Sequence, residues 1–554
     1  PTHNEMPAGL MGRQVAGKEF LDAYLTHGDW DEVVALVPNA ASAESFKQTC
    51  LSHPSSRDRQ RRLQIAMAGT FYDSYLPSPA SPQLYFPNPP DPRYAWIRTQ
   101  GPPHAYALSG VTHTLCSARA VDVLRTLVTD PWQPYDRLIC TSRAVRDMVV
   151  SVTDAWADDL RDRHGGQPRR SMPLEIIPLG VSTERFRPAT PEERAAERGR
   201  LGIAADELAV LFVGRLSHHA KAHPFPMYRA MAQAAGQTGR KACLLMVGWA
   251  ANDAVQCGFE DAARAFAPGV RVEFLDGLRD ENRFGAWRAA DVFCSLSDNI
   301  QETFGLVIVE AMASGLPVVA SDWNGYRDLV VDGATGFLVP TIMVRGATDD
   351  LTARLLLGEV NYDHFLAQAS QCVAVDSAAA ARAFARLFED ADLRRRMGEA
   401  GRQRAVREFA WPVVIRAYEN LWQAQEAERA ERAAQAGSKP PRHAGPAAYP
   451  APERSFAGYP ARWLDEHVPL VAAPDAAARL AVVAELPLTN HEARFRVSDA
   501  GVLMRLVERP GAVRTAGDLI DELAAATGAT PVVARATLAW LMKYDLLRVA
   551  EAHA

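Results

Sequence analysis

Short, uninterrupted runs of apolar residues recur between positions 31 and 340, and longer stretches with one apolar helical face separate them. Apolar runs without polar alternation are typical of strands buried on both faces of a parallel sheet. The runs form two sets: 32–37, 63–68, 106–110, 137–140 and 174–177, then 209–213, 242–247, 271–275, 292–295, 317–320 and 336–339. Because strand and helix patterns alternate in both sets, the sequence predicts an α/β protein with two Rossmann-like sheets.

The two sets are separated by residues 178–182 and a polar, Arg/Glu-rich stretch, which we interpret as a hinge. Six prolines between 437 and 460 indicate a semi-rigid linker near the end of the chain. We therefore expect a first Rossmann-like domain over 1–180, a second over 181–405, a crossing helix and extension over 406–432, a linker over 433–460 and a small module over 461–554.

The small module has helical patterns at 500–507, 516–526 and 531–544, between a short predicted strand and an apolar run at 546–549. It distantly resembles a winged helix or a small peptide-binding module of related shape. With 10 Lys and Arg against 12 Asp and Glu over 461–554, it lacks the basic face that nucleic-acid binding requires. Docking of a protein partner or an acceptor is favoured, and a structural cap or dimer contact stays open.

Charge and cysteine content restrict the environment of the protein. The 554 residues carry a net charge of −6, so no overall field attracts nucleic acid or anionic lipid. No run of about 18 apolar residues predicts a membrane-spanning helix, and the first residues lack a signal-peptide pattern. The seven cysteines are far apart, with no C-x-x-C pair. We expect a reduced, cytoplasmic protein without a zinc site, and leave peripheral contact with the inner membrane open.

The most informative residues lie between 299 and 320. Glu302 precedes a helix that is predicted to begin near Phe304 and end at Ser314-Gly315, and Gly305 would let the backbone approach a ligand closely. The unpaired amides of the first helical turn would form an anion site. Eight helical residues separate Glu302 from Glu310 by roughly 12 Å, which suits two ends of an extended ligand better than one acid–base pair.

This segment resembles the E-x7-E signature of the family 4 glycosyltransferases. Four other motifs of that family follow the expected order: 176–186, 213–216 with Lys221, 291–297 and 332–339. The resemblance covers about residues 170–425 and implies the two-domain GT-B fold. Trp323-Asn324-Gly325 stands where the family usually has Gly-Gly.

The resemblance implies a role for each matched residue. Glu302 would contact sugar hydroxyls, Glu310 would accept hydrogen bonds from a ribose, and Arg215 and Lys221 would neutralise a diphosphate. The backbone amides of Phe304, Gly305 and Leu306 would meet the pyrophosphate and sugar, and backbone groups around Leu278 would recognise the base. Two fixed cations would stabilise a departing diphosphate more in the transition state than in the ground state.

In the first half, His113 follows the predicted strand 106–110, at the sheet edge where ligands of parallel sheets bind. The family commonly places a histidine there, beside the reacting sugar. Residues 7–17 resemble its glycine-rich loop facing both substrates, with Gly9 and Gly12 as the expected contacts. The strand that normally precedes this loop is absent or too short in 1–6, so either the sequence begins late or the first sheet lacks its central strand.

The implied activity is transfer of a sugar from a nucleotide-sugar donor with retention, a leaving phosphate oxygen deprotonating the acceptor. No cofactor or metal is expected, since Asp390-Ala391-Asp392 lies in a predicted helix, 382–396, rather than at a strand end. The acceptor stays open among lipids, glycans, small molecules and proteins. The alternatives are a GT-B sugar phosphorylase or epimerase, a catalytically silent scaffold that docks partners through 461–554, and a sugar-controlled transcription factor.

Overall fold

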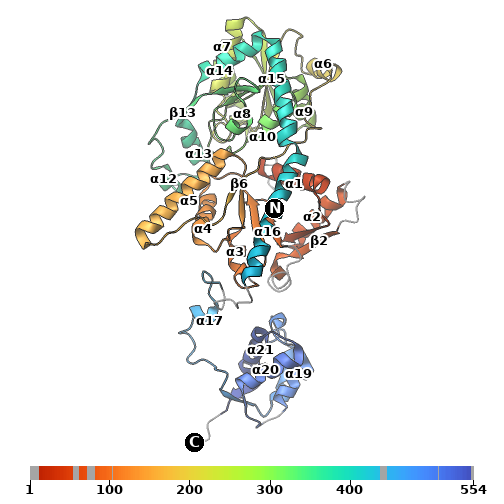
Figure 1. Ribbon diagram of the computed structural model, residues 1–554, viewed down its shortest axis with the longest axis vertical. Helices are drawn as coiled ribbons and strands as arrows, with labels where there is room; N and C mark the ends of the chain where they lie inside the picture. Colours follow the sequence, from red (N-terminus) through yellow and green to blue (C-terminus); the bar gives the residue numbers. More distant parts are fainter. Residues whose placement is uncertain are drawn as a thin grey trace. The chain divides into compact units, whose positions relative to one another are not determined.

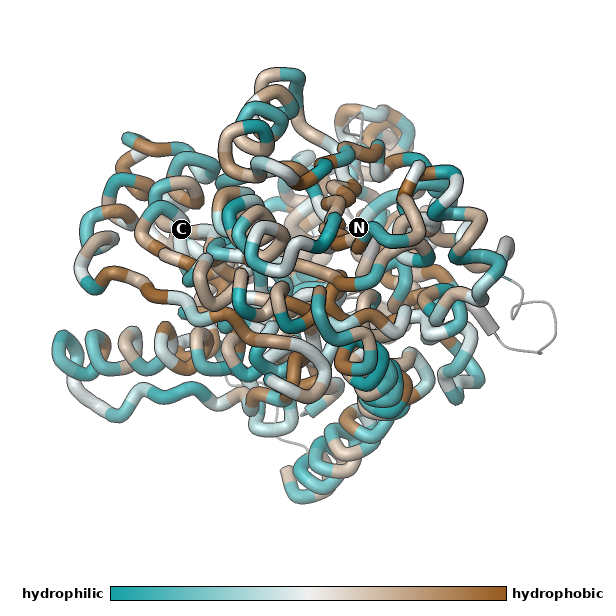
Figure 2. Tube along the Cα trace, turned by 90° about the horizontal axis from the view of Figure 1, so that it is seen from above, coloured by the Kyte–Doolittle hydropathy of each residue, from teal (hydrophilic) through white to brown (hydrophobic). Residues whose placement is uncertain are grey.

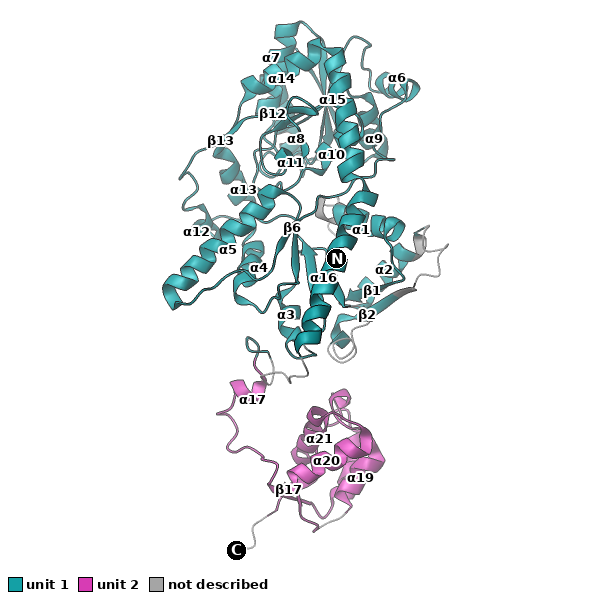
Figure 3. Cartoon of the chain, in the orientation of Figure 1, with its two compact units in different colours: residues 1–449 teal, residues 450–554 magenta. Residues whose placement is uncertain are grey.

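The computed structural model describes residues 12–53, 62–71, 82–102, 104–436, 446–508 and 511–550. The chain forms two compact units, residues 1–449 and 450–554 (Figure 3). This division falls inside the predicted linker 433–460. Within the described ranges, no helix is long and apolar enough to cross a membrane.

The first half of unit 1 contains two parallel sheets. A four-stranded sheet has the order β3-β4-β5-β6, and a separate pair joins β1 to β2. The strands are β1 (Glu32–Val37), β2 (Arg62–Met67), β3 (Gln83–Phe86), β4 (Ala107–Val111), β5 (Arg137–Cys140) and β6 (Leu174–Ile176). The helices are α1 (Gly12–His27), α2 (Ala40–Ser52), α3 (Pro92–Arg98), α4 (Ala118–Thr129) and α5 (Arg143–His164).

The second half is built on a six-stranded parallel sheet of order β12-β11-β10-β7-β8-β9. Its strands are β7 (Leu208–Val213), β8 (Ala242–Gly248), β9 (Arg271–Asp276), β10 (Val292–Ser295), β11 (Val318–Ser321) and β12 (Gly336–Val339). Read from β9 to β12, this is the doubly wound Rossmann order, in which the chain reverses direction between β7 and β10. Ligands of such sheets bind at the carboxyl ends of the strands at this switch point.

Helices cover both faces of the second sheet (Figure 1). They are α6 (Pro191–Arg200), α7 (Phe225–Thr238), α8 (Asp253–Phe266), α9 (Asp280–Ala289), α10 (Leu306–Ala313), α11 (Tyr326–Leu329), α14 (Ser377–Glu389) and α15 (Ala391–Arg404). The apolar core on one face includes α7, α8 and α14, and the core on the other includes α9 and α10. In Figure 2, hydrophobic and hydrophilic residues alternate along the long helices, as expected where one helical face is buried.

The long helix α16 (Trp411–Ala436) links the two halves of unit 1 (Figure 1). Val181 and Ala410 form a parallel bridge at the hinge, and α16 then packs against α1 and the first sheet. The Gln425 amide donates to the carbonyl oxygens of Leu108 and Tyr135. The aromatic residues of this joint pack against one another, as the sequence predicts for the crossing helix.

Gly180 is required at the hinge because a Cβ there would lie 2.2 Å from the Trp411 ring. We expect Gly180→Ala to lower the free energy of unfolding by about 1–3 kcal/mol, the usual cost of overpacking. Thermal unfolding measures this loss. Gly199→Ala is the matched control, since a Cβ at Gly199 would meet nothing within 4 Å. Equal melting temperatures for the two variants would contradict the hinge geometry.

A buried ion pair fixes β4, the strand that leads to His113. The Arg98 guanidinium lies 2.7 Å from the Asp136 carboxylate, and the two side chains are 4% and 0% exposed. Asp136 also accepts hydrogen bonds from the amides of Leu108 and Gln133. The pair therefore holds β4 in position, so we assign it a structural rather than a catalytic role.

Between β12 and α14 the chain makes an excursion that the sequence does not predict. It consists of β13 (Thr341–Met343), α12 (Leu351–Leu356), α13 (Tyr362–Gln371) and β14 (Val373–Val375). The two strands pair antiparallel, so the excursion leaves and rejoins the second half at neighbouring points. We call these elements the excursion.

Unit 2 is mainly helical, around a small antiparallel sheet of order β16-β15-β17. Its elements are α17 (Pro452–Ser455), β15 (Pro469–Ala472), α18 (Ala476–Glu485), α19 (Ala500–Val507), β16 (Arg514–Thr515), α20 (Ala516–Thr527), α21 (Pro531–Lys543) and β17 (Leu547–Val549). The three predicted helices are present, with a continuous apolar core. The prediction of a short strand immediately before α19 is wrong, because residues 493–495 form a 3-10 turn and the strand β15 lies earlier in the chain. The winged-helix likeness stays a prediction.

Three other expectations need correction. The sequence missed β3, because its four residues lie between proline-rich stretches. The predicted helix 382–396 is two helices that meet at Asp390, whose carboxylate caps α15 by accepting the Leu393 amide. α10 begins at Leu306 rather than near Phe304.

Candidate active site

Three of the predicted site residues lie in loops that follow neighbouring strands at the switch point of the six-stranded sheet. Arg215 and Lys221 follow β7, and Glu302 follows β10, its direct neighbour in the sheet. A glycine stands at the end of β7 and of β8, and a third follows β9. A Cβ at Gly248 would lie 2.0 Å from the carbonyl oxygen of Gly214, and one at Gly277 would lie 2.9 Å from the Cα of Gly248. The backbones therefore approach one another closely behind the site.

Lys221 and Glu302 form an ion pair, with Nζ 3.2 Å from Oε2. Their side chains are 42% and 14% exposed, so the lysine stays open to solvent while the carboxylate is largely covered. Burial raises the pKa of Glu302, but Lys221 and the amides of Phe304 and Thr303 outweigh it, so the pKa lies below its usual value. Glu302 is therefore ionised at neutral pH and held beside a cation.

Gly305 is the residue before α10 and has φ of 103°, a conformation that favours glycine. A Cβ at this position would lie 2.4 Å from the Tyr326 ring. The Phe304 amide donates to Glu302 Oε1 at 3.4 Å. The Ile308 amide donates to the Gly305 carbonyl, whereas the amides of Leu306 and Val307, the first two of α10, have no intrahelical acceptor and can serve as donors to an anion.

Arg215 and the histidines around Lys221 complete the loop after β7. Among the described residues, the Arg215 side chain has neither an ion-pair nor a hydrogen-bond partner, so its charge is available to an anion. The His218 ring lies 5.1 Å from that of His219 and 6.3 Å from that of His223. Burial lowers the pKa of both His219 and His223, so these two rings are neutral at pH 7.

Glu310 belongs to a second charged group. It is 5% exposed and interacts electrostatically with Glu19 of α1, and with Arg283 and Arg185. Burial raises the pKa of Glu310 to about 7, Glu19 adds to the rise, and the two arginines oppose it. Glu310 thus has different charged neighbours from Glu302, and its role at one end of an extended ligand stays a prediction.

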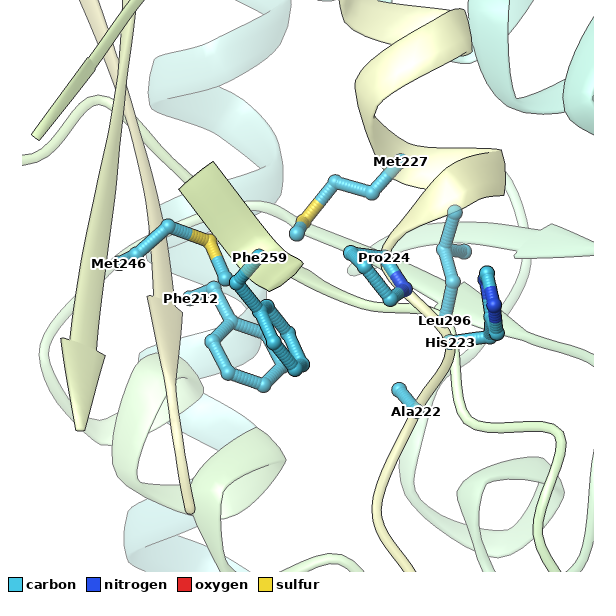
Figure 4. Close-up of a pocket in the computed structure, with 8 residues that line it drawn as sticks. All are labelled: Phe212, Ala222, His223, Pro224, Met227, Met246, Phe259 and Leu296. Atoms are coloured by element: carbon cyan, nitrogen blue, oxygen red, sulfur yellow. The ribbon is translucent and has the colours of Figure 1, made fainter. Parts of the chain in front are cut away.

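Two hollows accompany these groups. A small apolar cavity of about 10 Å³ lies behind the Lys221 loop, where Ala222 and His223 line it with core residues (Figure 4). It has room for about one water molecule. A more polar hollow of about 400 Å³ is lined by Arg185 and Phe284, and falls in the size range of small-molecule sites. Arg185 connects this hollow with the charges around Glu310.

The segment around Leu278 is exposed, but its amides are already engaged. Leu278 is 55% exposed, its N–H donates to Asp276 Oδ1, and the Gly277 N–H donates to the carbonyl of Gly248. Recognition of a base by backbone groups here would therefore use carbonyl oxygens rather than these two amides.

The first half contributes His113 as expected, at the end of β4. His113 Nε2 lies 3.1 Å from the Pro87 carbonyl, and Cys116, three residues later, contacts the second half through Tyr362. Gly9 lies outside the described residues. Gly12 is the first residue of α1, so the predicted glycine-rich loop 7–17 is helical from Gly12 onward.

Several residues near the site could not have been found from the sequence. Glu19 and Arg283 reach Glu310 from α1 and α9, and Tyr362 reaches the Glu302 loop from the excursion. Nothing in their local patterns distinguishes them from surface residues. In the described part of the chain, no group of three His, Cys, Asp or Glu side chains is arranged to hold a metal ion. The expectation that no metal is needed stays a prediction.

The raised pKa of Glu310 gives a test of its environment. A carboxylate whose pKa rises on folding stabilises the fold fully below its usual pKa, and the stabilisation is lost as pH rises through about 7. We expect Glu310→Gln to have a higher melting temperature than wild type at pH 8 but not at pH 5, which corresponds to a gain in the free energy of unfolding on the order of 2–3 kcal/mol between the two pH values. Glu399→Gln, at an exposed position on α15, is the control. A pH-independent difference between wild type and Glu310→Gln would contradict the assignment.

Comparison with known proteins agrees with this site. The family described as "Glycosyl transferases group 1" matches residues 193–357, which hold Arg215, Lys221, Glu302 and Glu310. A D-inositol 3-phosphate glycosyltransferase of Nocardia farcinica is 38% identical over 169 residues, 30% of this chain and 36% of that protein. A phosphatidyl-myo-inositol mannosyltransferase of Mycobacterium leprae is 36% identical over 171 residues, with the same two shares.

These matches span about a third of the length of those relatives. Among solved structures, Anabaena HepE in complex with UDP has a TM-score of 0.47 and 16% sequence identity, covering 76% of this chain and 97% of that chain. Residues 193–357 are therefore similar to the group 1 glycosyl transferases, and each half of unit 1 contains a parallel sheet, in agreement with the predicted α/β class.

Proposed function

We propose that this protein is a glycosyltransferase that moves a sugar from a nucleotide-sugar donor to an acceptor, with retention at the anomeric carbon. The observation that carries the proposal is the Lys221–Glu302 pair beside the first turn of α10, at the switch point of the second sheet. That arrangement offers a cation and helix amides for a diphosphate next to a carboxylate for sugar hydroxyls.

In the proposed reaction, the bond between the anomeric carbon and the phosphate oxygen breaks as the acceptor oxygen bonds on the same face. The acceptor proton passes to the leaving phosphate oxygen, so the nucleoside diphosphate carries it away. Lys221, Arg215 and the α10 amides stabilise the growing negative charge of that diphosphate. Glu302 orients the sugar, Glu310 holds the ribose, and His113 faces the transferred sugar from the first half.

The acceptor stays unassigned. The family match covers residues 193–357, whereas His113 and the loops expected to face the acceptor lie in the first half. The acceptors named for the relatives therefore do not carry over. The proposed acceptor is a lipid, a glycan, a small molecule or a protein. Residues 461–554 are a candidate module for docking it or a protein partner.

Binding of nucleoside diphosphates tests the donor site directly. We expect one of UDP, GDP and ADP to raise the melting temperature of the full chain, since a ligand at 100 times its dissociation constant adds about 2.7 kcal/mol of stability. The shift should shrink in Glu310→Gln and persist in Glu399→Gln. If none of the three raises the melting temperature of the wild type, the proposal is contradicted and the catalytically silent scaffold is favoured. Release of sugar phosphate only when inorganic phosphate is present would favour a phosphorylase.

A further inference from the structure

The excursion packs under loops from both halves of unit 1. Its helices α12 and α13 share one apolar cluster with Ala220, which precedes Lys221, and with Ile300, two residues before Glu302. Cys116, from the loop after His113, packs against the same cluster. The excursion is therefore a common support for the three loops that carry the predicted site residues.

Tyr362, the first residue of α13, joins two of these loops through its hydroxyl. The Gln301 side-chain amide donates to Tyr362 Oη at 3.2 Å, and Cys116 Sγ lies 3.0 Å from the same oxygen. Since the amide can only donate, the phenol oxygen accepts there and keeps its own hydrogen for the thiol. One hydroxyl thus connects the residue before Glu302 with the first half.

The residue after Glu302 is held from the first half as well. The Ser142 hydroxyl, at the N-cap of α5, donates to the carbonyl oxygen of Thr303 at 2.8 Å. The Glu302 carbonyl itself accepts from the Asn324 amide, within the second half. Movement of one half relative to the other would therefore act on both neighbours of Glu302 in the chain.

We propose that Tyr362 is a positioning residue: by tying the Cys116 loop to Gln301, its hydroxyl sets the place of the Glu302 carboxylate when the two halves of unit 1 are closed on each other. This inference rests on the proposed function for its kinetic consequences. Burial raises the pKa of both Tyr362 and Cys116, so the contact is between neutral groups and persists across the neutral pH range.

Hydrolysis of UDP-glucose, GDP-mannose and ADP-glucose by the full chain provides the kinetic test, with the sugar nucleotide that wild type cleaves fastest used throughout. Tyr362→Phe removes only the hydroxyl and with it the tie between Gln301 and Cys116, and we expect kcat to fall about three- to tenfold, the scale of a net hydrogen-bond contribution. KM and the affinity for the nucleoside diphosphate should stay within twofold, because the donor contacts remain. Tyr228→Phe is the matched control, since in the described part of the chain its hydroxyl donates to the Phe259 carbonyl, inside the second half.

Substitutions at Cys116 separate positioning from general loss of packing. Cys116→Ala should reproduce the kcat loss, and Cys116→Ser, which keeps a hydrogen-bonding partner, should recover most of it. Tyr362→Phe combined with Cys116→Ala should be no slower than Tyr362→Phe alone, because loss of the hydroxyl already removes the contact with Cys116. Additive losses, or equal kcat for Tyr362→Phe and Tyr228→Phe, would overturn the inference.

Amide hydrogen exchange tests the same contact without activity. Residues 112–117 and 299–303 should exchange faster in ligand-free Tyr362→Phe than in wild type or Tyr228→Phe. Unchanged exchange in both loops refutes the tie between them. A wild type that neither binds a diphosphate nor cleaves a sugar nucleotide refutes the proposed function instead, and the exchange result then still decides whether Tyr362 joins the loops.

Discussion

Lys221→Met should reduce donor turnover by about 10²–10³-fold, the usual cost of removing one preorganised group that stabilises developing charge. The Lys221 ammonium lies 3.2 Å from the Glu302 carboxylate, and its side chain is 42% exposed to solvent. Its removal would take away the charge that we propose meets the diphosphate, and also the strongest influence that keeps the pKa of Glu302 low. Without Lys221, burial would oppose the ionised form with less compensation, so the pKa of Glu302 would rise. Initial rates of nucleotide release from the sugar nucleotide measure the loss.

Lys241→Met is the matched control for this prediction. Lys241 pairs with Asp206 at 2.9 Å, but both side chains are largely exposed, at 72% and 63%. Exposed pairs contribute little to stability, so the rate should stay within twofold of wild type. Lys221→Arg should recover part of the rate, since a guanidinium restores the positive charge but not the position of the lysine ammonium. A Lys221→Met variant that keeps a third or more of wild-type turnover would remove Lys221 from the mechanism.

Asp136→Ala should lower the free energy of unfolding of unit 1 by about 3–5 kcal/mol, because it leaves the Arg98 charge buried without its partner. It also removes the acceptor of the Leu108 and Gln133 amides. At roughly 2–4 °C for each kcal/mol in a domain of this size, the melting temperature should fall by about 6–20 °C. Calorimetry on the full chain measures the change.

An exposed pair nearby provides the comparison for Asp136. Asp122 lies 3.4 Å from Arg125, and their side chains are 68% and 45% exposed. Asp122→Ala should change the melting temperature by less than about 2 °C, in keeping with the small contribution of surface pairs. If Asp136→Ala and Asp122→Ala have the same melting temperature, the buried pair does not hold β4 in place.

The strands of both halves could be predicted from the sequence because their signal is local. Residues 242–247, for example, form an unbroken apolar run that fits only a doubly covered strand, and β8 covers the same positions. Gln83–Phe86 gave no such signal, since four residues between prolines are too short for a periodic pattern. The excursion was missed for a related reason: its strands have three residues each, and only their pairing with one another defines them.

The residues of the candidate site fall into the same two groups: those that a local sequence pattern predicts and those that only the fold brings together. Glu302, Gly305 and Glu310 lie in one contiguous segment, so the sequence alone predicts their spacing and the helix between them. Lys221 is 81 residues from Glu302, and only the adjacency of β7 and β10 brings the two together. The approach of Glu19 to Glu310, from the other half of unit 1, has no counterpart in any local pattern.

The sequence by itself therefore determined the α/β class, the two Rossmann-like halves and the donor segment, because backbone periodicity, glycine conformation and helix-terminus chemistry act over a few neighbouring residues. The tertiary structure decided which charges share a buried environment, and so which carboxylate is ionised and which has its pKa raised. It also decided that Tyr362 joins Cys116 to Gln301, 246 and 61 residues away along the chain. Such contacts depend on the order of strands and on how the halves close, and neither is encoded within any single segment.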